Sequence, residues 1–165
     1  MKKIFLIQKT QLKRHKYLVI DEWLPHYLSD INNEDKQIRA LNFIYKLIDY
    51  KCKILILKDG KFIKKANSLK IISDEKVRHC SKLLHNSILR NSKKTIEVCE
   101  NKLSRVSTII KNNKKIKQDD HYLIQLYNSR NNSCIITTDE ILKNELVRLH
   151  FDIYLVDEFM TKFFK

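Results

Sequence analysis

Short apolar runs that alternate with helical patterns constrain the fold of this chain more than any other feature. The runs lie at residues 3–8, 17–20, 53–57, 133–137 and 153–156. They are brief, almost continuously apolar and rich in β-branched or aromatic residues, as strands buried on both faces of a sheet are. Strands that alternate with helices predict an α/β fold, with three α/β/α layers around a mainly parallel sheet.

The predicted helices carry apolar residues three and four positions apart, as one buried helix face requires. The first of them follows Pro25, with Ser29 or Asp30 as its expected N-cap. The middle third of the chain shows the same spacing, and we expect it to be helical throughout. The other helices are expected at residues 62–66, 74–88, 96–110, 123–127 and 141–149, with Asp59-Gly60 as a turn.

Size and composition indicate one domain over residues 1–165, because 43% hydrophobic content suffices for a core. Gly60 is the only glycine, which argues against the glycine-rich loops that bind nucleotide phosphates. The four cysteines lie far apart and offer neither a zinc knuckle nor a disulfide framework. No apolar run approaches the ~20 residues of a membrane span, and the N-terminal run is too short for a signal peptide. We therefore expect a cytoplasmic protein without a membrane partner.

The chain is strongly basic, with a formal net charge of +14. Such a charge is most simply explained by a polyanionic partner, either nucleic acid or an anionic membrane surface. A lysine-rich bias of the whole composition would give the same total. Charge alone leaves both explanations open.

Three aspartates stand where predicted strands end or a predicted helix begins. Asp21 ends the strand at 17–20, Asp139 follows the strand at 133–137, and Asp120 precedes a helix. Because the carboxyl ends of parallel strands share one edge of a sheet, we expect these acids to gather there. A lone acid in such a position is commonly a helix cap, but three together would repel one another unless a cation neutralised them. Oxygen ligands favour Mg²⁺ or Mn²⁺ over zinc or copper.

The same residues resemble the PIN domain family of metal-dependent ribonucleases. The family's first strand with its leading aspartate resembles residues 17–21 (YLVID), and its late helix start resembles residues 119–124 (DDHYLI). Its strand that ends in Thr-x-Asp resembles residues 135–139 (IITTD). The resemblance covers roughly residues 16–159 and is most specific in the last third.

The resemblance implies an endoribonuclease that hydrolyses RNA phosphodiester bonds. Asp21, Asp120 and Asp139 would hold one or two Mg²⁺ or Mn²⁺ ions that activate water. Thr137 would orient Asp139 or a metal-bound water, and Asp119 would cap the helix or support the ligands from outside. The main alternative is a noncatalytic RNA-binding or RNA-processing protein on the same scaffold. A third reading is an interaction domain whose acids only cap helices.

The sequence departs from the family pattern at two places. Glu22 and Trp23 follow the first aspartate where the family has a small hydroxyl residue and asparagine, and Glu22 is either an extra ligand or a solvent-facing residue. Residues 59–65 carry lysines where the family has a glutamate, after the second strand. Glu97 and Glu100 are candidates to replace that glutamate.

Clusters of lysines are expected to bind the RNA backbone beside the acids, although an ordinary solvated face would look the same. The expected RNA-binding residues are Lys58, Lys61, Lys64, Lys65, Lys111, Lys114 and Lys115, with Lys117 next to them. A further cluster lies at residues 9–16. The resemblance also implies a homodimer, and an antitoxin or an RNA-processing protein as a partner. The sequence leaves these partners open.

Overall fold

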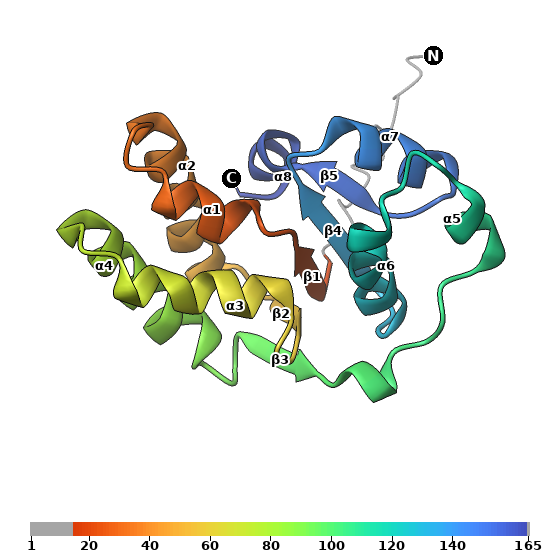
Figure 1. Ribbon diagram of the computed structural model, residues 1–165, viewed down its shortest axis with the longest axis horizontal. Helices are drawn as coiled ribbons and strands as arrows, with labels where there is room; N and C mark the ends of the chain where they lie inside the picture. The colour runs from red at the N-terminus through yellow and green to blue at the C-terminus, as the bar shows by residue number, and fades with distance from the viewer. Residues whose placement is uncertain (1–14, 165) are drawn as a thin grey trace, which may run out of the picture.

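The computed structural model describes residues 15–164, and the strand predicted at 3–8 lies outside them. At its centre is a five-stranded sheet in the order β3-β2-β1-β4-β5, in which neighbouring strands are all parallel (Figure 1). The strands are β1 (Tyr17–Ile20), β2 (Lys53–Leu57), β3 (Thr95–Val98), β4 (Ser133–Thr137) and β5 (Ile153–Leu155). The predicted α/β fold with a parallel sheet is confirmed.

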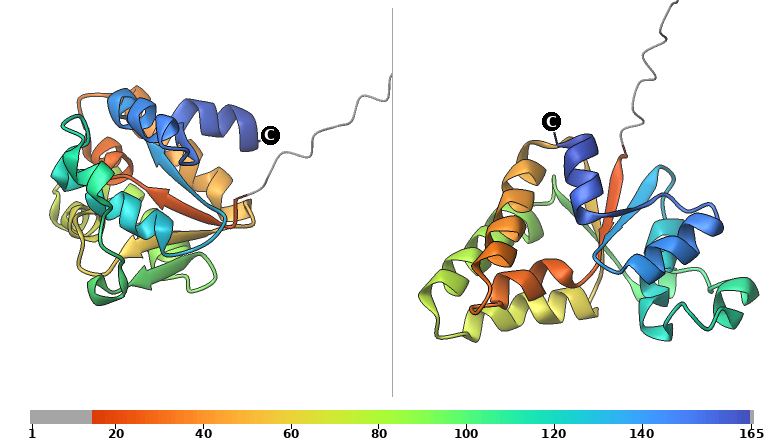
Figure 2. Two further views of the ribbon diagram at one scale, coloured as in Figure 1. Left: turned by 90° about the vertical axis from the view of Figure 1, so that its right-hand side faces the viewer. Right: turned by 90° about the horizontal axis from the view of Figure 1, so that it is seen from above.

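Helices cover both faces of the sheet, and Figure 2 shows the resulting three layers edge-on. One face carries α1 (Trp23–Ser29), α2 (Glu34–Asp49), α3 (Lys61–Ser68), α4 (Glu75–Leu83) and α8 (Val156–Phe163). The other carries α5 (Thr108–Asn112), α6 (His121–Asn128) and α7 (Glu140–Arg148). Between these elements lie the short 3₁₀ helices η1 (Leu69–Ile71), η3 (Glu100–Lys102) and η4 (Gln118–Asp120) and the π-helical η2 (Leu84–Leu89). Within residues 15–164, no helix is long and apolar enough to cross a membrane.

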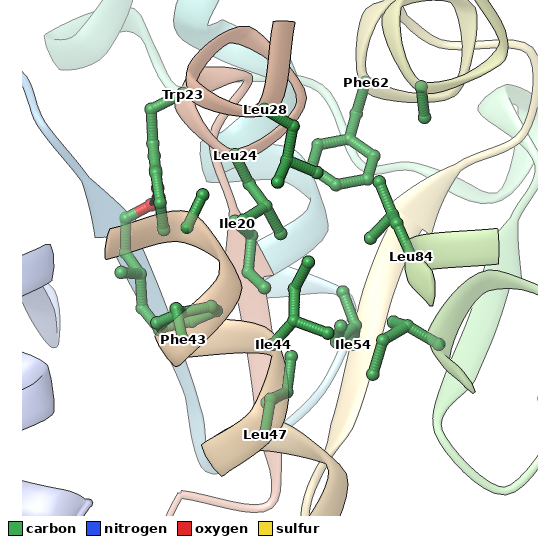
Figure 3. Close-up of a cluster of buried hydrophobic side chains, with 14 of the residues drawn as sticks. Ile20, Trp23, Leu24, Leu28, Phe43, Ile44, Leu47, Ile54, Phe62 and Leu84 are labelled. Carbon is green, nitrogen blue, oxygen red and sulfur yellow. Dashed lines mark hydrogen bonds between the residues drawn. The ribbon is translucent and has the colours of Figure 1, made fainter. Parts of the chain in front are cut away.

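Alternation along the strands divides the core into two halves. Leu18 and Ile20 of β1 point into the half beneath α1 to α4, whereas Val19 points toward α6 and α7. Figure 3 shows the first half, where Ile20 lies among side chains from the surrounding helices, Phe43 of α2 included. Burying each large apolar side chain stabilises the fold by roughly 1.5–3 kcal/mol. Packing on both faces of the sheet thus holds β1 in place, and with it the position at which β1 ends.

The order of the strands creates a switch point between β1 and β4. The chain runs from β1 to β2 and β3 in one direction, then returns past β1 to form β4 and β5 on the other side. The helices after β1 and the helix after β4 therefore lie on opposite faces of the sheet. A crevice opens outside the carboxyl ends of the strands at such a point. In this chain the switch point lies where β1 and β4 end.

The predicted Asp59-Gly60 turn joins β2 to α3. Asp59 has a left-handed φ of 58°. A Cβ atom on Gly60 would lie 2.9 Å from the Cβ of Leu57, so glycine alone allows the chain to fold back so closely. Helix α3 begins at the next residue, Lys61, and the turn therefore determines where the lysines of α3 lie.

Two predicted helix starts have different outcomes in the structure. The helix start predicted near residue 74 is confirmed: Asp74 caps α4, and its carboxylate accepts a hydrogen bond from the backbone N–H of Val77. The cap predicted at Ser29 or Asp30 is wrong, because α1 occupies that segment and α2 starts after Asn33. Pro25 lies in the first turn of α1, where its missing N–H removes no intrahelical hydrogen bond.

The prediction that residues 96–110 form a helix is wrong. Residues 95–98 form the edge strand β3, which pairs with β2 through the register Ile54 to Thr95, and α5 starts only at Thr108. The apolar residues of this segment contact the core from a strand, a turn and a loop in succession. Their spacing in the sequence is nevertheless similar to that of one buried helix face. The last strand also ends one residue early, because Val156 begins α8, a helix that the apolar pattern did not predict.

Candidate active site

Asp21 and Asp139 meet through the hydroxyl of Thr137 at the switch point. The backbone N–H of Asp21 donates to Ile136 O of β4, which extends the ladder to the end of β1. The fully buried Thr137 donates from Oγ1 to Asp21 Oδ2 at 2.9 Å and accepts a hydrogen bond from the Asp139 N–H at 3.0 Å. One hydroxyl thus fixes the carboxylate of one acid and the backbone of the other.

Asp139 has two different carboxylate oxygens. Oδ1 caps α7 by accepting a hydrogen bond from the Leu142 N–H at 2.9 Å. Oδ2 lies 3.7 Å from Nζ of Lys117. The interpretation of a strand-end acid as a helix cap is therefore correct for one oxygen, and the other lies near Lys117.

Asp120 ends η4 and stands at the start of α6. Burial, with repulsion from Asp21 and then Asp139, raises the pKa of Asp120 to about 6, against opposing effects of Lys117 and Lys61. Burial is also the main cause that raises the pKa of Asp21, to which the charges of Glu22 and Asp139 add. The charges of neighbouring aspartates thus contribute to both pKa shifts. We call Asp21, Asp120 and Asp139 the aspartate cluster.

Glu22 lies beside this cluster and is held by two groups of the chain. Its Oε2 lies 2.7 Å from Nζ of Lys65, and its Oε1 lies 3.5 Å from the hydroxyl of Tyr122. Burial and then the charges of the nearby acids raise the pKa of Tyr122, so its hydroxyl stays protonated at neutral pH. Of the two expectations for Glu22, the solvent-facing one is wrong, because only 19% of its side chain is exposed.

The other predicted acidic residues, Asp119 and the pair Glu97 and Glu100, lie outside the aspartate cluster. Asp119 is 79% exposed and forms an ion pair with Lys61 at 2.8 Å, which holds the pKa of Asp119 below its usual value. It therefore points to α3 rather than capping a helix. Glu97 lies exposed on β3, and β2 separates that strand from β1. Glu97 is thus two strands away from Asp21, and Glu100 lies beyond it in η3.

The carboxylates do not enclose a metal ion. Among residues 15–164, no three His, Cys, Asp or Glu side chains converge closely enough to hold one. What the structure brings together is a group of acids whose repulsion three lysines offset in part. A shared cation at the aspartate cluster stays a prediction.

Two basic hollows flank the aspartate cluster. The first, of about 660 Å³, is lined by Lys61, Lys64, Arg105 and Lys111, and it reaches Asp119 and Tyr122. The second, of about 430 Å³, is lined by Lys114, Lys115, Lys117 and Arg148, and it reaches Asp139. A smaller hollow shares Lys111 with the first and Lys114 with the second. We call the surface lined by the residues of these three hollows the basic groove.

The basic groove includes five of the seven lysines expected to bind RNA. Lys65 lies instead beside Glu22, and Lys58 follows β2, where its N–H donates to Val98 O. Lys115 lies 3.4 Å from Glu145, which also holds Asn113 and Arg148. The sequence did not single out Arg105 and Arg148, because each lies outside the lysine clusters and reaches the groove only through the fold.

Comparisons with known proteins do not assign this chain to a family. No family model matches the sequence, and neither the curated proteins nor the solved structures contain a match. The resemblance to the PIN domain family therefore depends on the motifs of this chain and stays a prediction.

The raised pKa of Asp120 predicts a pH-dependent gain in stability for Asp120→Asn. The folded protein binds this proton more tightly than the unfolded chain, so stability is lost as pH rises from about 4 to 6. At pH 7.5 without metal, the variant should be about 1–2 kcal/mol more stable than the parent, a figure reduced for partial exposure. At pH 4 the difference should vanish.

Urea unfolding at both pH values measures this effect. Asp119→Asn is the matched control, since it removes the exposed neighbouring carboxylate and should not stabilise the fold at pH 7.5. Equal stability of the parent and Asp120→Asn at pH 7.5 would show that the cluster does not repel Asp120.

Proposed function

We propose that this protein is a Mg²⁺- or Mn²⁺-dependent endoribonuclease with the aspartate cluster as its hydrolytic centre. One observation carries the proposal: three mutually repelling aspartates lie at the switch point of a parallel sheet, beside a groove lined by lysine and arginine. Repulsion of this kind lowers stability, and a cation would relieve it. The groove supplies positive charge for a polyanion at the same place.

The proposed ion would bind at an open magnesium site, because no three ligating side chains of residues 15–164 converge. Mg²⁺ usually keeps several waters and binds proteins through one or two carboxylates together with substrate phosphates. Such a site does not need three converging side chains. Asp21 and Asp120 offer oxygen ligands, and Thr137 already holds the Asp21 carboxylate in place. The three-layer fold also agrees with what the resemblance to the PIN domain family implies.

Each part of the site would have a separate task in hydrolysis. A divalent ion, when bound, activates water and stabilises the charge that develops on the phosphate. Asp21 and Asp120 hold that ion, and Thr137 orients Asp21. Lys61, Lys64 and Lys111 bind phosphates that flank the scissile bond. The hollow that reaches Asp119 and the hollow that reaches Asp139 would hold the strand on either side of the cluster, as internal cleavage requires.

A second function, RNA binding without catalysis, is favoured by the ion pairs of the cluster. Lys65 neutralises Glu22, and Lys117 lies near Asp139. In this alternative the ammonium groups replace metal ions altogether, and the basic groove alone carries the function. Both functions involve the same RNA surface, so only a test of chemistry separates them.

Cleavage of single-stranded RNA tests the catalytic proposal. The purified protein should cleave RNA with Mg²⁺ or Mn²⁺ and not with EDTA. Asp120→Asn should reduce the rate roughly 100-fold or more, because the amide keeps the shape but loses the charge that holds the ion. Asp119→Asn, which alters the adjacent exposed residue, should retain activity within a few-fold. Cleavage in EDTA, or full activity of Asp120→Asn, would contradict the mechanism.

Salt dependence tests the groove independently of chemistry. Lys64→Gln combined with Lys111→Gln should weaken RNA binding and reduce the slope of log K against log [salt] by about 1.4, since each phosphate contact to a single strand contributes about 0.7. Lys51→Gln is the control, because Lys51 precedes β2 at the opposite edge of the sheet. A slope unchanged in the double variant would assign the groove to solvated surface.

A further inference from the structure

Helix α7 presents an apolar side chain to the second hollow of the basic groove. Ile141 is 59% exposed and lines this hollow of about 430 Å³, which Asp139 of the aspartate cluster also lines. Four of the other residues that line the hollow are cations. A single exposed isoleucine is common on a protein surface, but this one lies in a concave, basic site beside the proposed hydrolytic centre.

Ile141, Asn144 and Arg148 form one face of α7. They are three and four residues apart, so their side chains follow one another along the helix, and all three line the hollow. Ile141 and Arg148 are separated by two turns, or about 10 Å along the helix axis. A flat ring between them needs roughly 7–8 Å, which is one van der Waals contact of about 3.5–4 Å on each side. The spacing therefore suits one planar ring between the isoleucine and the guanidinium.

Arg148 is held in place by a buried acid. Its Nη1 donates to Oε1 of Glu145 at 2.9 Å, and the other oxygen of that carboxylate accepts a hydrogen bond from Asn113 Nδ2 at 3.1 Å. Glu145 is only 9% exposed, whereas the side chain of Arg148 is 68% exposed. The ion pair restricts the guanidinium and leaves most of the side chain accessible. A guanidinium plane restricted in this way is a good stacking partner for a nucleobase.

The hollow combines the groups that recognise an unpaired base. The isoleucine offers apolar contact to a ring, the guanidinium offers a stacking plane, and the amide of Asn144 offers a donor and an acceptor to the ring's edge. Lys114 and Lys117 line the same hollow and suit the phosphates on either side of that nucleotide. A base within a duplex is paired and stacked, and its faces are not accessible to such a site.

We propose that the second hollow is a subsite for one unpaired nucleobase of the RNA, next to the phosphate at the aspartate cluster. Ile141 and Arg148 contact the two faces of the ring, and Asn144 contacts its edge. The inference rests on the proposed function, because it specifies which RNA that same site takes. A base, and not only the phosphate backbone, then contributes to affinity.

Binding of two single-stranded oligomers, measured by fluorescence anisotropy in EDTA to prevent cleavage, tests this subsite. One is a short uridine oligomer, and the other has the same length and the same phosphates but no bases. The parent protein should bind the uridine oligomer roughly tenfold more tightly, since a stacked base adds affinity that phosphates do not supply. Ile141→Ser should weaken binding of the uridine oligomer roughly fivefold and change binding of the abasic oligomer less than about twofold.

Two further variants separate base contact from charge and from surface apolarity. Arg148→Lys keeps the positive charge and loses the planar guanidinium, so it should also lower only the affinity for the uridine oligomer. Val147→Ser is the matched control for Ile141→Ser. Val147 is a β-branched residue of the same helix with 48% exposure, but its position six residues after Ile141 places it on a different face. This control should leave both affinities unchanged.

The outcomes distinguish the subsite from the proposed function. Equal affinity of the parent protein for both oligomers, an equal loss for both in Ile141→Ser, or equal effects of Ile141→Ser and Val147→Ser would overturn the base subsite and leave an RNA-cleaving enzyme intact. Failure of the parent protein to bind either oligomer at low salt would overturn the proposed RNA function together with the subsite.

Discussion

The parallel pairing of β1 with β4 is the interaction on which the rest of the site depends. It sets Asp21 beside Ile136 and brings Thr137 within hydrogen-bond distance of the Asp21 carboxylate. The same hydroxyl holds the backbone of Asp139 at the start of α7. Trp23 strengthens this pairing from α1, since its buried indole N–H donates to Ile136 O. Packing on both faces of the sheet thus fixes two acids 118 residues apart in sequence.

The site combines charges that a fold designed only for stability would avoid. Asp120 is partly buried near two other aspartates, and its pKa rises to about 6 as a result. Cations offset part of this repulsion: Lys117 approaches Asp139, and Lys65 pairs with Glu22. The repulsion that is left is the basis of the proposed cation site. The basic groove lies nearby and carries charge that suits a polyanion.

Local signals explain which parts of this arrangement could be predicted from the sequence. The strands β1, β2 and β4 are continuous apolar runs bounded by polar residues, and each is found where it was expected. Asp21 and Asp139 follow two of them directly, so the shared edge of a parallel sheet was enough to bring these acids together. The position of Asp120 at a helix start was predicted from the apolar pattern of the residues that follow it, which form α6.

The features that the sequence did not predict depend on contacts between distant segments. Strand β3 lies at the edge of the sheet, and the spacing of its apolar residues continues into a loop, so the pattern suited a helix equally well. The ion pair between Lys65 and Glu22 joins residues from α3 and from the start of α1, two helices that contact each other only in the folded chain. Arg105 reaches the groove from the loop after β3.

The most direct test of a cation-binding aspartate cluster is the thermal melting of the purified protein with and without Mn²⁺. A ligand that binds only the folded state stabilises it by about 2.7 kcal/mol at 100 times its dissociation constant, which raises the Tm of a domain of this size by several degrees. The account predicts such a rise for the parent protein at millimolar Mn²⁺, and its loss in Asp120→Asn. A Tm that does not respond to Mn²⁺, or that rises equally in both proteins, would contradict it.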